Sequence, residues 1–137
     1  MNPLGLEVEQ RARRSKTVTA RDVELYAEIT EDRNPLHFDP DFAARTRFGR
    51  LVAQGGITSG MLNALVAMDL PGPGTVFMSQ SLRYLAPTYL GDTLTAEVEV
   101  LAVKPDKPVC QLKATITNQD GTVVLEGECW TYTLQPK

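Results

Sequence analysis

The sequence predicts an α+β fold in which a curved antiparallel sheet of about five strands wraps around one central helix. Residues 54–70 carry apolar or small side chains on every side, which is typical of a helix enclosed by other structure. From residue 75 onward the hydrophobic pattern changes from a helical period to a period of two, which is typical of half-buried strands. Short turn sequences separate these alternating segments, so we expect consecutive strands to pair antiparallel.

The length and charge of the chain limit the kinds of protein it can be. It has 137 residues, a length at which roughly two-thirds of the unfolded surface is buried on folding, and we expect a single domain over residues 1–137. Its net charge is −3 and its basic residues are dispersed, so no nucleic-acid partner is expected. No apolar run is long enough to span a membrane, and residues 1–10 have no secretion-signal pattern. We therefore expect a cytoplasmic protein without a membrane partner.

The cysteines and the single histidine argue against a metal site. Cys110 and Cys129 each lie inside an alternating strand pattern, so we expect two reduced thiols in the core. His37 is the only histidine, and one histidine with two distant cysteines does not make a standard zinc set. No metal and no cofactor are predicted.

The N-terminal part of the chain predicts one strand and one helix. Residues 12–18 are expected to form an irregular first strand that ends at Val18. Thr19 then has the character of an N-cap, with Asp22 at the third helical position, as in a capping box. Apolar residues follow at helical spacing, including Val23 and Tyr26. We therefore expect a helix over residues 20–30.

Residues 31–43 have the sequence of a stiff turn between two helix ends. Pro35 fixes its own backbone and excludes Asn34 from the helical region, so the preceding helix must end here. Asn34 can bond its own backbone in an Asx-turn. Asp39 reads as an N-cap, with Pro40 at the first position of a short helix over residues 40–45.

This turn holds the candidate catalytic groups. Asp32 and His37 flank the Asn-Pro pair, so a rigid turn would hold a carboxylate and an imidazole at one separation. General acid/base chemistry on a shared water requires such an arrangement. Taken alone, a single histidine in a turn is better explained as a cap or a structural hydrogen-bonding group than as a catalytic residue.

The loop over residues 46–52 and its border are basic. Arg45, Arg47 and Arg50 are candidates to meet phosphate groups. Each of them is also explained as a solvated loop charge, and the sequence leaves both readings open.

Three glycines crowd the N-terminal half of the predicted central helix. Glycine weakens a helix, so Gly55, Gly56 and Gly60 need another explanation, such as the close approach of a ligand or of backbone. Free N–H groups at a helix N-terminus form a site for a developing oxyanion. Tight packing against strands explains the glycines equally well on residue chemistry alone.

The second half of the chain predicts four long strands. In the first, Val76, Met78, Leu82 and Tyr84 are expected to share one face. The clearest alternation runs over residues 94–102, a turn follows at 104–108, and the next strand covers 110–116. A hairpin at 118–121 leads to the last strand over 123–134.

The motif Asp-Arg-Asn-Pro-Leu-His over residues 32–37 is followed by Asp-Pro at 39–40 and Phe-Ala at 42–43. This pattern resembles the hydratase signature of the MaoC-like, (R)-specific enoyl-CoA hydratases. The similarity continues through a glycine-rich helix start at Gly55 and the strand Leu-Gly-Asp-Thr-Leu-Thr-Ala-Glu-Val-Glu-Val over residues 90–100. The resemblance implies the hotdog fold. It also implies a homodimer or dimer of dimers that pairs through an edge strand, with the thioester tunnel near the subunit interface.

The resemblance also implies a reaction. A trans-2-enoyl-CoA of short to medium acyl length would be hydrated reversibly to the (R)-3-hydroxyacyl-CoA by syn addition of one water. Asp32 would be the base, His37 would orient the water and relay the proton, and the backbone N–H of Gly55 would polarise the thioester carbonyl. Asn34 and Asn63 are expected to support the site: Asn34 by holding the turn, and Asn63 by pointing toward His37 or, equally, by satisfying a buried backbone group. Two residues depart from the family pattern. Serine is common in the family at the position of Asn63, and histidine or an aromatic residue is common at the position of Gln54.

Two other functions stay open on the sequence. Hotdog acyl-CoA thioesterases often carry a catalytic carboxylate on the central helix, but residues 55–68 contain no Asp or Glu. The other alternative is a non-catalytic acyl-thioester-binding module. Met61, Leu65 and Met68 are candidates to line an acyl chain, but each is better explained as a core residue. No spacing singles out a CoA phosphate ligand, and Arg83, Lys104 and Lys107 are the candidate cations.

Overall fold

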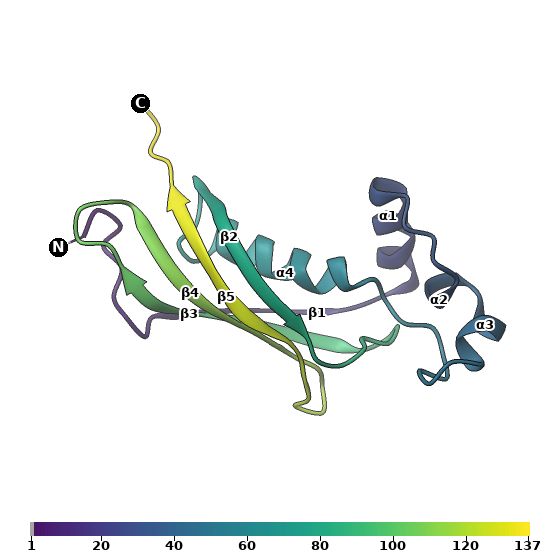
Figure 1. The fold of residues 1–137 in the computed structure, drawn as a ribbon. Coiled ribbons are helices and arrows are strands. Elements are labelled where there is room, and N and C mark those ends of the chain that lie inside the picture. The colour runs from purple at the N-terminus through teal and green to yellow at the C-terminus, as the bar shows by residue number, and fades with distance from the viewer. Residues whose placement is uncertain (1) are drawn as a thin grey trace.

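A computed structural model describes residues 2–137 as one five-stranded antiparallel sheet with a long helix along one of its faces (Figure 1). The elements follow in the order β1 (Arg11–Thr17), α1 (Ala20–Thr30), α2 (Pro35–Phe38), α3 (Pro40–Ala44), α4 (Gly55–Met68), β2 (Thr75–Tyr84), β3 (Thr93–Val103), β4 (Val109–Thr117) and β5 (Val123–Thr133). The strand order in the sheet is β1-β3-β4-β5-β2, so β1 and β2 form the two edges. The predicted α+β architecture is confirmed.

The central strands follow the predicted alternation. In β3 the side chains of Leu94, Ala96, Val98 and Val100 are fully buried, and the residues between them are more exposed. Because successive side chains point to opposite faces of a strand, this pattern directs one face of the sheet to α4 and the other to solvent. The core lies between that inner face and α4.

The prediction that Val76, Met78, Leu82 and Tyr84 share one face of β2 is wrong. The register of β2 against β5 shifts between Phe77 and Ser79, which marks a β-bulge. An extra residue in one strand reverses the alternation beyond it, so Phe77 and Leu82 both pack against the core although they are an odd number of positions apart. Met78 is 59% exposed and Tyr84 is 56% exposed.

Helices α1 and α3 begin at their predicted caps. Thr19 accepts a hydrogen bond from the backbone of Asp22, and the Asp22 side chain accepts one from the backbone of Thr19, which completes the capping box. Asp39 caps α3 through hydrogen bonds from the backbone of residues 41 and 42. Helix α2 was not predicted, because a single helical turn after Pro35 has no periodic signal of its own.

Helix α4 is buried on one side only. Leu62, Leu65 and Val66 are buried against the sheet, together with Met61. Met68 is 59% exposed on the other side of the helix. The expectation of a helix enclosed on all sides is therefore not met within one chain. Among residues 2–137 no helix is long and apolar enough to cross a membrane.

Candidate active site

Asp32 lies just beyond the C-terminal end of α1. The helix ends at Thr30, and Glu31 adopts a left-handed backbone with φ 67° that turns the chain away from the helix axis. The Asp32 carboxylate accepts a hydrogen bond from the backbone N–H of Asn34 at 3.2 Å. Its side chain is 42% exposed, so water reaches it.

His37 lies on α2 and is held by the backbone of a different segment. Asn34 caps α2, with its side-chain oxygen 3.0 Å from the backbone nitrogen of Leu36, which agrees with its predicted structural role. The His37 ring places Nδ1 2.6 Å from the carbonyl oxygen of Val52. A carbonyl oxygen only accepts hydrogen bonds, so Nδ1 carries the hydrogen and the neutral ring has its lone pair on Nε2.

The other ring nitrogen faces the carboxylate. His37 Nε2 is 3.8 Å from Oδ2 of Asp32, and the imidazole is only 10% exposed. That separation is longer than a direct hydrogen bond and allows one water to contact both atoms. The structure therefore brings together the two residues that the sequence predicted as a pair.

Val52 connects this pair to the start of α4. Its backbone N–H donates to the carbonyl oxygen of Leu36 at 3.1 Å, and it forms an isolated β-bridge with Tyr89. The next residue, Ala53, donates to the carbonyl oxygen of Thr88 at 2.7 Å. The segment that holds His37 is thus fixed immediately before Gly55, which begins α4.

Gly55 has the features expected of an oxyanion donor. It is exposed at the first position of α4, and its N–H has no hydrogen-bond acceptor among residues 2–137. A Cβ added to Gly55 would lie 3.0 Å from Cε1 of Tyr84, so the glycine allows this ring to approach the backbone closely. The carbonyl of Gly55 accepts a hydrogen bond from Thr58 at 2.6 Å, which orders the first turn of the helix.

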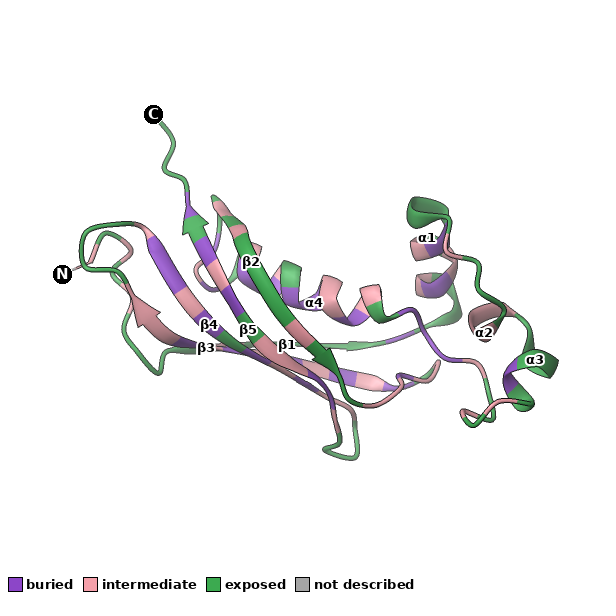
Figure 2. Ribbon diagram, in the orientation of Figure 1, coloured by how far each residue is buried: buried purple, intermediate pink, exposed green. Residues whose placement is uncertain are grey.

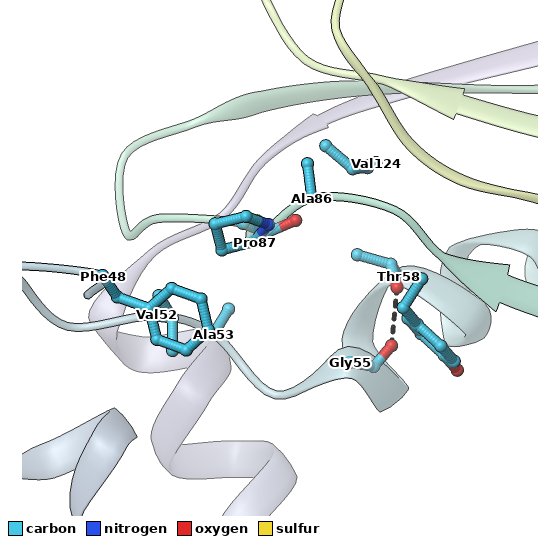
Figure 3. Close-up of a pocket in the computed structure, with 10 residues that line it drawn as sticks. Phe48, Val52, Ala53, Gly55, Thr58, Ala86, Pro87 and Val124 are labelled. Atoms are coloured by element: carbon cyan, nitrogen blue, oxygen red, sulfur yellow. Dashed lines mark hydrogen bonds between the residues drawn. The ribbon is translucent and has the colours of Figure 1, made fainter. Parts of the chain in front are cut away.

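Gly55 lies on the wall of an apolar pocket of about 210 Å³ (Figure 3). The start of α4, the segment before it and the segment after β2 face one another across this pocket. The lining residues are Phe48, Val52, Ala53, Gly55, Thr58, Tyr84, Ala86, Pro87, Thr88 and Val124. Val52 therefore contributes to the pocket and also holds His37 through its carbonyl oxygen.

Two further predicted positions have different surroundings. The Asn63 side chain is exposed and accepts a hydrogen bond from Gln80 on β2 at 3.1 Å, so its partner is a strand residue rather than His37. Gln54 is 1% exposed and donates to the carbonyl oxygen of Val23 at 3.1 Å. This bond ties α1 to the residue that precedes Gly55.

Three groups at the site were not found by sequence reasoning. The carbonyl of Val52 carries no side-chain signal, because any residue provides the same acceptor. Tyr84 was expected only to share a strand face with Leu82, and no local pattern indicates that its ring lies beside Gly55. Thr58, which is 3% exposed, follows Gly55 by three positions. Residues three apart share one face of a helix, so this spacing could have identified Thr58 as a pocket residue.

The two cysteines lie in the core, as the strand pattern predicted. Both are buried and free, and burial raises the pKa of each thiol above its ordinary value, for Cys129 to about 12. Neither is positioned to act as a thiolate near neutral pH. Among residues 2–137 no group of three or more His, Cys, Asp or Glu side chains is arranged to hold a metal ion.

Comparison with known proteins places the chain among close relatives. The sequence model of the MaoC like domain matches residues 4–124. The (R)-specific enoyl-CoA hydratase of Aeromonas caviae is 42% identical over 128 residues, which are 93% of this chain and 96% of that protein. The 3-hydroxybutyryl-CoA dehydratase of Methylorubrum extorquens is 43% identical over 113 residues, which are 82% of this chain and 71% of that protein.

A solved structure agrees with the same assignment. The (R)-hydratase from A. caviae, described as involved in PHA biosynthesis, superimposes with a TM-score of 0.91 at 41% identity, over 95% of this chain and 98% of that one. This likeness confirms the expected hotdog fold. The hydratase and dehydratase named above are lyases, which confirms the expected enzyme class. Because the family match covers most of the sequence and both relatives align over most of their length, this chain belongs to the MaoC-like domain family.

Proposed function

We propose that this chain catalyses the reversible, (R)-specific hydration of trans-2-enoyl-CoA thioesters to (R)-3-hydroxyacyl-CoA. The observation that carries the proposal is the pairing of Asp32 and His37 across 3.8 Å, with His37 bonded to a residue that also lines the pocket of Gly55. The names of the relatives in Aeromonas caviae and Methylorubrum extorquens support the same reaction class.

In the proposed reaction one water binds between the carboxylate of Asp32 and Nε2 of His37. Both groups accept its hydrogens, which leaves an oxygen lone pair free to attack C3 of the enoyl group. As the C3–O bond forms, the C2–C3 double bond shifts its electron pair toward the thioester, and negative charge develops on the thioester oxygen. The proton removed from the water by the pair then returns to C2 on the same face, so addition is syn.

The backbone N–H of Gly55 is proposed to stabilise the charge on the thioester oxygen. It lacks an acceptor among the described residues, and it opens α4, where the helix dipole favours negative charge. Loss of a comparable donor in other enzymes costs about 3 kcal/mol of transition-state stabilisation, and loss of a general acid/base group costs about 10²–10⁴ in rate. The Gly55 N–H and the pair are thus expected to contribute similarly.

The acyl group is proposed to occupy the apolar pocket beside Gly55. A volume of about 210 Å³ with an apolar lining suits acyl chains of short to medium length. Of the candidate lining residues, Met61 and Leu65 lie in the core, and Met68 is exposed on the far part of α4. We also propose that residues 1–137 act as one domain and that the protein works in the cytoplasm.

A homodimer through the free edge of β2 is part of this proposal. Figure 2 shows β2 as exposed along most of its length, in contrast to the banded burial of its neighbour β5. Val76 and Met78 on this strand are exposed apolar residues, as is Met68 on α4. A bare strand edge beside apolar side chains favours pairing with a second copy. Such a copy would also cover the open side of α4.

The test follows the absorbance of the enoyl thioester when purified protein is added to crotonyl-CoA. The wild type is expected to remove the absorbance and to yield (R)-3-hydroxybutyryl-CoA, as determined by chiral analysis. The variants Asp32→Asn and His37→Gln are expected to lose about 10²–10⁴ of the rate. Lys113→Gln, on the exposed face of β4, serves as a matched control and is expected to keep the wild-type rate.

Other outcomes point to the alternative functions. Release of free CoA without hydration would support a thioesterase, although α4 carries no carboxylate between Gly55 and Met68. Binding of enoyl-CoA without turnover, over several acyl lengths, would support a non-catalytic module. Formation of the (S) product would overturn the proposed stereochemistry.

A further inference from the structure

Three arginines without carboxylate partners lie in the loop that precedes the candidate site. We call residues 45–50 the arginine loop, after Arg45, Arg47 and Arg50. All three are exposed, and none is within ion-pair distance of an acidic group in the part of the chain that the structure describes. Most other basic side chains of the N-terminal region are paired, for example Arg14 with Asp69 at 2.5 Å. In a chain of net charge −3, the arginine loop is a local cationic surface.

Hydrogen bonds within the arginine loop fix its backbone. Thr46 donates from its hydroxyl to the carbonyl oxygen of Ala43 at 2.7 Å and accepts from the N–H of Phe48 at 3.2 Å. The N–H of Gly49 bonds the carbonyl oxygen of Thr46 at 3.1 Å, with Gly49 at φ 76°, where glycine is favoured. Tyr89 donates from its hydroxyl to the carbonyl oxygen of Phe48 at 3.0 Å. The backbone from which the arginines project is therefore ordered before any ligand binds.

Two of the guanidinium groups lie over aromatic rings. Arg50 lies 4.0 Å from the centroid of the Tyr89 ring, and Arg47 lies 5.4 Å from that of Phe48. A cation–π contact uses no N–H donor of the guanidinium, so the donors of these two arginines stay available to bind an anion. A planar fork of donors matches the oxygens of a phosphate.

The arginine loop borders the proposed acyl site. Phe48 lines the same pocket as Gly55 (Figure 3). Arg50 lines a second depression of about 320 Å³, together with Pro40, Gly49, Leu51 and Leu90. The arginine loop therefore contributes Phe48 to the pocket proposed for the acyl group and Arg50 to a second depression.

We propose that the arginine loop binds the phosphate of the phosphopantetheine arm that carries the acyl thioester. This inference rests on the proposed hydratase function and adds the binding site of the carrier. Coenzyme A and acyl carrier protein share this phosphate. The other candidate cations fit less well, because Lys104 and Lys107 lie in the β3–β4 turn at the opposite end of the sheet from α2 and α3 (Figure 1), and Arg83 is paired with Glu126.

The test compares crotonyl thioesters that share the pantetheine unit and differ in what is attached beyond it, and the first two differ only by the phosphate. The series consists of crotonyl-pantetheine, crotonyl-4′-phosphopantetheine, crotonyl-CoA and crotonyl acyl carrier protein. Replacing each arginine by glutamine is expected to raise KM about tenfold for the phosphate-bearing thioesters, with kcat retained, because a charge-assisted hydrogen bond to the ligand is lost. The kcat/KM for crotonyl-pantetheine is expected to stay unchanged. Lys113→Gln, which removes the same charge on β4, is the matched control and should behave as the wild type.

Several results would overturn the inference. If the arginine variants lose as much kcat/KM with crotonyl-pantetheine as with the phosphate-bearing thioesters, the substitutions disturb the site itself. If Lys113→Gln loses as much kcat/KM as the arginine variants, the effect is one of net charge only. A loss confined to the carrier-protein thioester would assign the arginines to contact with that protein's surface. If the wild type hydrates none of the four thioesters, the proposed function fails, and the arginine-loop inference is then tested without it. Calorimetry would measure the binding of 4′-phosphopantetheine to the wild type and to the arginine variants, and equal binding by all of them would overturn the inference.

Discussion

His37 donates the hydrogen on Nδ1 to the carbonyl oxygen of Val52 across 2.6 Å. This bond sets the orientation of the ring and leaves Nε2 as the nitrogen that faces Asp32. Because Val52 is also bonded to Leu36 and lies two residues before Gln54, the same backbone segment positions the imidazole and leads into α4. The roles of the two ring nitrogens can therefore be tested separately.

The first prediction concerns His37→Asn. An asparagine amide reaches the position of Nδ1 and keeps a donor for Val52, but it places no group at Nε2. We expect the melting temperature to stay near that of the wild type, while hydration of crotonyl-CoA falls about 10²–10⁴-fold. His37→Ala should lose the same activity and, in addition, about 1 kcal/mol of unfolding free energy, because the Val52 bond is lost. Retention of activity by His37→Asn would contradict the proposed role of Nε2.

The second prediction concerns Gly55→Ala. The added Cβ would lie 3.0 Å from the ring of Tyr84, a residue that is 56% exposed and therefore has room to move. We expect a folded protein in which kcat falls about tenfold or more, because the methyl group crowds the N–H proposed to meet the thioester oxygen. Gly60→Ala in the same helix is the control: a Cβ there meets nothing within 4 Å, so we expect full activity and a gain of up to about 1 kcal/mol in unfolding free energy.

The third prediction concerns assembly. Met78→Asp places a charge on the exposed edge of β2, where the proposed dimer would pair, and is expected to give a monomer in light scattering. Ile29→Asp on α1 is the control, because Ile29 is 83% exposed and lies away from that edge. It should keep the mass of the wild type. A dimer that survives Met78→Asp unchanged would exclude β2 as the interface.

The fourth prediction concerns the thiols and pH. Burial raises the pKa of the Cys129 thiol to about 12 and also raises the pKa of the Cys110 thiol. In the unfolded chain each thiol has its ordinary pKa of 9.0, so above pH 9 the unfolded chain releases protons that the folded state keeps. The unfolded state then binds fewer protons, and the free energy of unfolding falls as pH rises from about 9 toward about 12.

Urea denaturation over this range checks the fourth prediction, with the variant Cys110→Ala/Cys129→Ala as its control. The variant should lose less stability between these pH values than the wild type. Thiol reagents should label neither cysteine in the native protein at neutral pH and both in urea. Rapid labelling of the native protein would show that the thiols are not held in the core.

The sequence alone determined the elements that depend on local chemistry. Thr19 and Asp22 fixed the start of α1 because a capping box is formed by residues three positions apart. The alternation of Leu94, Ala96 and Val98 determined which face of β3 is buried. The turn at residues 32–37 indicated a fixed pairing of acid and imidazole, whose catalytic role stays a proposal. Each of these signals lies within a few residues, where propensity and patterning act.

The tertiary structure decided what depends on distant segments. The acceptor for His37 is a backbone carbonyl fifteen positions away, and backbone groups have no sequence signature. The bulge in β2 arises from its register against β5, so the inward face of the strand could not be read from its own alternation. Tyr84 reaches Gly55 only because that strand ends beside the start of α4. Local patterns thus specified the helices, the strands and the pairing of Asp32 with His37. Packing between the elements set the distances between these groups, because such distances depend on contacts between residues that are far apart in the sequence.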